Sequence, residues 1–115
     1  MVARDIVGAH YGLRDWLAQR ITAVVMALYT LVFLVLLCSS PKLDFAAWRA
    51  LFAPQWLKLA TLLFLLSLYF HAWVGMRNIF MDYIKSSSLR LVLYAVVIAV
   101  LTVYAGWSVQ ILWSV

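Results

Sequence analysis

The sequence predicts an all-α integral membrane protein with three transmembrane helices, forming a single domain over residues 1–115. Of its 115 residues, 68% are hydrophobic and only 11% are charged, and the mean hydropathy is +1.02. A soluble domain is typically about half apolar and a quarter charged, so a chain of this composition needs lipid as its main solvent. Its three long apolar runs are each close to the ~20 residues that cross a bilayer as a helix.

The first two predicted elements are a membrane helix at about 15–38 and a short interfacial helix at about 44–52. Residues 21–38 carry no charge, and the sequence Ser-Ser-Pro at 39–41 ends the apolar run. In the loop that follows, Asp44 can cap a short helix. Trp48 and Phe52 place that helix on the membrane surface.

The second and third membrane helices are predicted at about 57–83 and 89–113. Residues 59–76 and 91–115 carry no charge, and a short polar turn that contains Lys85 lies between the two helices. Each run is long enough to span the hydrocarbon core.

The distribution of Lys and Arg predicts the orientation in the membrane. The N-terminal segment and the second connection together hold six, the first connection holds three, and the C-terminal end holds none. They are Arg4, Arg14 and Arg20, then Arg77, Lys85 and Arg90, against Lys42, Arg49 and Lys58. The positive-inside rule therefore puts the N-terminus in the cytoplasm and the C-terminus in the periplasm of a bacterial inner membrane. The net charge of +5 then reflects topology, and we expect no nucleic-acid partner.

His71 is the most informative residue of the second membrane helix. At 1.5 Å per residue it lies roughly 16 Å from each end of the lipid-embedded part, near the bilayer midplane. Ionisable residues at this depth are costly and normally face protein or a cavity. Residues spaced three and four apart share its face, and Gly75 leaves room one turn beyond it for something flat and wide. This polar stripe consists of Ala60, Phe64, Ser67, His71, Gly75, Asn78 and Asp82.

Three interpretations of His71 stay open: a hydrogen bond to another helix, a proton relay, or ligation of a metal-centred cofactor. A bare metal site is disfavoured, because the chain offers no second ligand at that depth and His10 lies outside the membrane. Haem is favoured, with the other axial ligand from a partner helix. We expect the free ring N–H to bond one turn away, at Ser67. Arg20 is a candidate partner for a haem propionate.

Small residues recur on one face of the first and of the third membrane helix, where they allow close helix packing. Three helices alone cannot easily enclose a haem, so we infer a membrane partner. The small residues are Ala23, Ala27 and Thr30, and then Ala95, Ala99, Thr102 and Gly106.

Two segments resemble the hydrophobic membrane anchor of bacterial succinate dehydrogenase, complex II, which is the small cytochrome b556 polypeptide of that enzyme. They are RDWLAQRITA at 14–23 and HAWVGM at 71–76, the latter followed by Asp82 and Tyr83. The resemblance covers nearly the whole chain and implies pairing with a second membrane anchor of three helices. The six helices would hold one haem b between a histidine of each anchor, and would bind an iron–sulfur protein and a flavoprotein on the cytoplasmic face.

The same resemblance implies that electrons from succinate reach ubiquinone at the junction with the iron–sulfur protein. His71 would be the axial ligand of the haem iron, Tyr83 would contact ubiquinone, and Asp82 would lie near the quinone and orient Tyr83 or pass protons. No catalytic residue is expected on this chain. Some relatives have a histidine where this chain has Arg14, which leaves the role of that position open. An anchor of a fumarate reductase, or a non-redox scaffold or transporter component, are the alternatives.

The topology is testable by cysteine labelling. A cysteine added after Val115, in a chain that carries Cys38→Ser, should react with a membrane-impermeant thiol reagent added to intact cells. Labelling that occurs only after permeabilisation would reverse the orientation.

Overall fold

The computed structural model describes the backbone of residues 2–115 and the side chains of residues 12–115, so the side chains of Arg4 and His10 lie outside the described residues. The chain forms four helices: α1 (Val2–Ser39), α2 (Phe45–Leu51), α3 (Gln55–Tyr83) and α4 (Ser87–Trp113). Three of them, α1 from Gly12 onward, α3 and α4, are long and apolar enough to cross a membrane. The all-α fold with three spans is confirmed.

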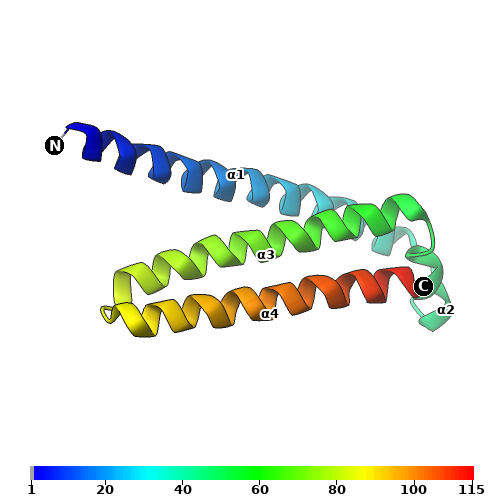
Figure 1. Cartoon of the computed structure of the whole chain (residues 1–115). Helices are drawn as coiled ribbons and strands as arrows, with labels where there is room; N and C mark the ends of the chain where they lie inside the picture. Colours follow the sequence, from blue (N-terminus) through cyan, green and yellow to red (C-terminus); the bar gives the residue numbers. More distant parts are fainter. Residues whose placement is uncertain (1) are drawn as a thin grey trace.

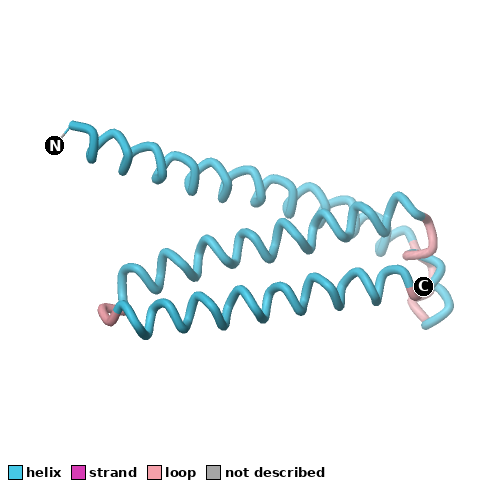
Figure 2. The backbone as a smooth tube through the Cα atoms, in the orientation of Figure 1, coloured by secondary structure: helices cyan, strands magenta, loops and turns pink. Residues whose placement is uncertain are grey.

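The three long helices lie side by side, with α3 packed against both α1 and α4 (Figure 1). The bundle is elongated, measuring 61 × 27 × 21 Å. Figure 1 shows the N- and C-termini at opposite ends, and shows α1 and α3 diverging toward the N-terminal end. The connections are short in Figure 2, where nearly all of the tube is helical.

The helix boundaries match the sequence-based ones to within about two residues, except at the start of α1. That helix begins at Val2 instead of near residue 15. Residues 2–14 contain no proline and no polar turn, so nothing in this segment breaks the helix that continues from the membrane.

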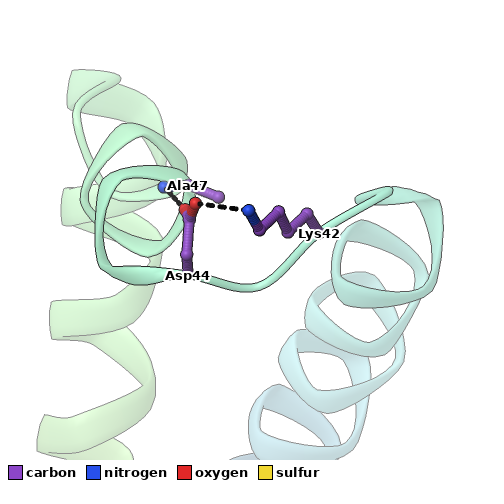
Figure 3. Close-up of polar contacts among 3 residues, drawn as sticks. All are labelled: Lys42, Asp44 and Ala47. Carbon is purple, nitrogen blue, oxygen red and sulfur yellow. Dashed lines mark hydrogen bonds and ion pairs between the residues drawn. The ribbon is translucent and has the colours of Figure 1, made fainter.

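Asp44 caps α2 as the sequence indicated (Figure 3). Its Oδ1 accepts a hydrogen bond of 2.8 Å from the backbone N–H of Ala47. Lys42 Nζ lies 3.7 Å from Asp44 Oδ2, but both side chains are exposed, so this ion pair contributes at most about 1 kcal/mol. Trp48 of α2 and Phe52, the residue that caps its C-terminus, contact Phe33 of α1, with ring centroids 6.0 and 5.7 Å from that of Phe33.

The packing is the reverse of that in a soluble protein. Among the described residues, four hydrophobic side chains are buried, whereas five polar or charged ones are buried between the helices. Large apolar side chains cover the outside, where lipid is their solvent, and polar groups have to find partners inside. The buried polar residues are Thr22, Lys58, Thr61, Ser67 and Ser108.

Polar side chains also pair in the contact between α3 and α4. The hydroxyl groups of Tyr69 and Ser108 lie 2.6 Å apart, and Ser108 also donates to the carbonyl of Tyr104 at 2.7 Å. One turn along α3 from Tyr69, the ring of Trp73 lies 5.7 Å from that of Tyr94. Polar bonds and aromatic contacts therefore hold the two helices together.

The two small-residue faces are largely exposed in this chain. Ala27 and Thr30 of α1 are exposed, and only Ala23 is half-buried. The four small residues of α4 are also exposed, and a Cβ added at Gly106 would meet nothing within 4 Å. Both faces are therefore free for a neighbour outside this chain.

Candidate functional site

A groove of about 740 Å³ lies between the N-terminal half of α1 and the C-terminal half of α3. Its volume falls within the range of roughly 300–1,000 Å³ that is common for ligand sites. We call it the α1–α3 groove, and it is lined by Gly12, Asp15, Trp16, Gln19, Arg20, Ala23, His71, Asn78 and Met81.

Three polar pairs join α1 to α3 along and beyond this groove. The α1 members are seven residues apart, and seven residues make almost two full helical turns, so all three face α3. The pairs are an ion pair between Asp15 and Arg77, a contact of 2.9 Å between Thr22 Oγ1 and His71 Nδ1, and a contact of 2.5 Å between the hydroxyls of Tyr29 and Thr61. We call these the three α1–α3 polar pairs.

His71 is half-buried, and its ring is fixed from α1. Nδ1 lies against Thr22, and Nε2 has no hydrogen-bond partner within residues 12–115. The expectation that Ser67 is the partner is wrong. Ser67 is buried one turn away on the same helix, but α1 presents Thr22 closer to the ring. Nδ1 is therefore hydrogen-bonded, and Nε2 has no partner in the described part of the chain.

The space beside Gly75 borders a side chain of α1. A Cβ added at Gly75 would lie 3.9 Å from Nε2 of Gln19, which is an ordinary van der Waals distance. Gly75 does not line the groove, and the expectation that it leaves room for a flat group stays a prediction. Gln19 Oε1 is buried without a hydrogen-bond partner in the described part of the chain.

Arg20 lines the same groove as His71. Its guanidinium carbon lies 5.5 Å from the centroid of the Trp16 ring, in the geometry of a cation–π contact. Arg14 is exposed on α1 and does not line the groove. The structure thus brings the proposed iron ligand and the proposed propionate partner together, although the haem role of each stays a prediction.

Asp82 and Tyr83 form the end of α3 and do not line the groove. Both are exposed, Tyr83 by 77%. In residues 12–115 neither side chain has a hydrogen-bond partner, so Asp82 does not orient Tyr83 within this chain. The tyrosine is free to meet a group outside the chain, and its quinone role stays a prediction.

Apart from Arg20, sequence reasoning missed the α1 side of this site. Thr61, Tyr69 and Arg77 lie off the polar stripe predicted on α3, yet each bonds to a neighbouring helix. A signal was present, because Asp15, Thr22 and Tyr29 recur at a spacing of seven in a mostly apolar stretch. That spacing places polar groups on one helix face, where a partner must satisfy them.

Comparison with known proteins identifies relatives of this chain. A family model described as "Succinate dehydrogenase/Fumarate reductase transmembrane subunit" matches residues 2–106. The chain is 38% identical over 102 residues to the succinate dehydrogenase hydrophobic membrane anchor subunit of Coxiella burnetii (strain RSA 493 / Nine Mile phase I). That match covers 89% of each chain.

The ion pair between Asp15 and Arg77 predicts a specific non-additivity. The two side chains are 34% and 29% exposed, so Asp15→Asn or Arg77→Gln alone leaves a partly buried charge unpaired. Each single change should lower the free energy of unfolding by about 1–3 kcal/mol, and the double change by less than the sum. Thermal or detergent unfolding of the purified protein measures this. Lys42→Gln, which breaks an exposed pair, is the control and should have no measurable effect. Additive losses would contradict a direct coupling.

Proposed function

The chain belongs to the succinate dehydrogenase/fumarate reductase transmembrane-subunit family and is a membrane anchor subunit of that family. We propose that it anchors a succinate dehydrogenase, binds haem b together with a second membrane anchor, and contributes to the ubiquinone site.

One observation carries the haem proposal: His71 lies in the central part of a membrane-spanning helix, in a groove, with Nε2 unpaired among the described residues. The residues of the groove fit a haem, because an imidazole suits iron and the guanidinium of Arg20 suits a propionate. His71 would hold the iron, and a partner histidine would complete its axial ligation. The haem, when bound, supplies a one-electron Fe(III)/Fe(II) couple.

The exposed small-residue faces support a membrane partner. Backbones approach closely at small residues, and no hydrophobic force drives helices together in lipid. A second anchor of three helices on these faces would complete a six-helix bundle around the groove. The cytoplasmic face, at the end that holds Arg14, Lys85 and Arg90, would carry the iron–sulfur protein and the flavoprotein. The N-terminus would then be cytoplasmic and the C-terminus periplasmic.

Tyr83 supports the ubiquinone proposal. It ends α3 about 18 Å along the helix axis from His71, at the predicted cytoplasmic edge of the bilayer. A phenol there can donate a hydrogen bond to a quinone carbonyl while its ring stays in the interface. Asp82, exposed beside it, can exchange protons between water and the reduced quinone.

An anchor of a fumarate reductase is the second candidate, since the family includes both enzymes. The membrane histidine and the name of the Coxiella burnetii relative favour succinate oxidation. Family membership argues against an unrelated transporter component.

The haem ligand is tested by changing His71. In the purified complex, His71→Ala should abolish the sharp b-type bands of the reduced haem, and His71→Gln should lose the bis-imidazole spectrum. Ser67→Ala is the matched control, because Ser67 is a buried residue on the same face that makes no hydrogen bond to the ring. This variant should keep both the reduced b-type bands and the bis-imidazole spectrum. An unchanged spectrum in the His71 variants would refute the assignment.

The quinone contact is tested by Tyr83→Phe, which removes only the hydroxyl. Quinone reduction should slow, or the apparent KM for ubiquinone should rise about tenfold, because one hydrogen bond to the head group is lost. Haem content and assembly should not change, because the side chain is exposed and unpaired in this chain. Normal quinone kinetics in a fully assembled variant would rule the contact out.

A further inference from the structure

We propose that Thr22 of α1 is a positioning residue that fixes the tautomer and orientation of His71, so that Nε2 is the nitrogen presented to the haem iron. This inference rests on the proposed haem-binding function. Thr22 does not itself contact the cofactor; it acts through His71.

The surroundings of the Thr22 hydroxyl carry the argument. The residue is 9% exposed, so little solvent competes for its bonds. Its Oγ1 lies 2.8 Å from the carbonyl oxygen of Ala18 and 3.2 Å from that of Gln19. The third neighbour is Nδ1 of His71, at 2.9 Å. Two of these three neighbours can only accept a hydrogen bond, and the hydroxyl has a single proton to donate.

The proton positions follow from this geometry. If Thr22 donates to the carbonyl of Ala18, its lone pairs face Nδ1, and the N–H of His71 donates to Oγ1. If Thr22 instead donated to Nδ1, its oxygen would lie 2.8 Å from a carbonyl oxygen with no proton between them, which is repulsive. The first arrangement is therefore favoured. It leaves Nε2 unprotonated, and the neutral nitrogen with a lone pair is the form that ligates a metal.

The hydrogen bond from His71 Nδ1 to Thr22 also affects how strongly the ring would donate electrons to the iron. A metal-bound histidine normally donates its other N–H to an outer acceptor, which orients the ring and strengthens its donation to the metal. Here the acceptor comes from a different helix, so the angle of the ring depends on how α1 packs on α3. Stronger donation favours Fe(III), and loss of the acceptor should favour Fe(II).

The experiment compares three variants of the purified complex. Thr22→Val keeps the shape and removes the acceptor, Thr22→Ser keeps the hydroxyl, and Ser39→Ala is the control. Ser39 ends the same helix and its hydroxyl donates to the carbonyl of Leu36 at 3.0 Å, but it is exposed and lies at the opposite end of α1 from the groove. The readouts are the haem midpoint potential and the electron paramagnetic resonance spectrum of the ferric haem.

We expect Thr22→Val to raise the ratio of reduced to oxidised haem at a fixed ambient potential by up to about tenfold, which is about 59 mV for one electron. Its ferric spectrum should change, because the imidazole plane is no longer fixed. Thr22→Ser should restore both readouts, and Ser39→Ala should leave them unchanged. If Thr22→Val does not assemble, Thr22→Ala is judged by the same shift.

Two outcomes separate this inference from the function on which it rests. A wild-type potential and spectrum in the haem-containing Thr22→Val or Thr22→Ala variant would overturn the positioning role and leave the haem ligand intact. A haem spectrum that survives His71→Ala would instead remove the ligand assignment, and with it the reason for Thr22 to matter.

Discussion

The structure depends on one constraint: a polar side chain within the membrane has to find its partner on a neighbouring helix. Lipid offers no hydrogen bonds, so each hydroxyl, imidazole or charge that is placed between helices determines which faces can meet. The three α1–α3 polar pairs meet this requirement. The Tyr69–Ser108 bond does the same between α3 and α4. Most large apolar side chains face outward, although Leu57, Val74, Val97 and Leu112 are buried.

This constraint gives α3 its central position, and it makes the two ends of the bundle differ in how α1 and α3 are joined. At the end that carries α2, aromatic rings of α1, α2 and α3 close the gap between helices; Tyr29 stacks on Phe64 with centroids 4.6 Å apart. At the other end, the ion pair of Asp15 and Arg77 is the one polar pair that joins α1 and α3 beyond His71 within the described residues, and the groove opens between the diverging helices. The side chains proposed to act on a cofactor lie at this open end.

On the proposed function, the α1–α3 groove would form one half of a haem site. One imidazole and one guanidinium line the groove, while the small-residue faces of α1 and α4 lie exposed on the outside. A membrane anchor that works with a partner needs such an arrangement, because a cofactor shared between chains has to remain open to the second chain. Tyr83 is likewise exposed, and its hydroxyl has no hydrogen-bond partner within the described part of this chain.

The sequence by itself determined the class, the three spans, the Asp44 cap and the importance of His71. These follow from hydropathy, local capping chemistry and the cost of an ionisable group in lipid, all of which act within one helix. Only the tertiary structure decided that Thr22, not Ser67, bonds to His71, that Gln19 lies beside Gly75, and that Arg77 pairs with Asp15. Each of these contacts joins residues on different helices, far apart in the chain. Which of two polar groups reaches a ring first depends on the rotation and divergence of α1 against α3, and no local pattern encodes that geometry.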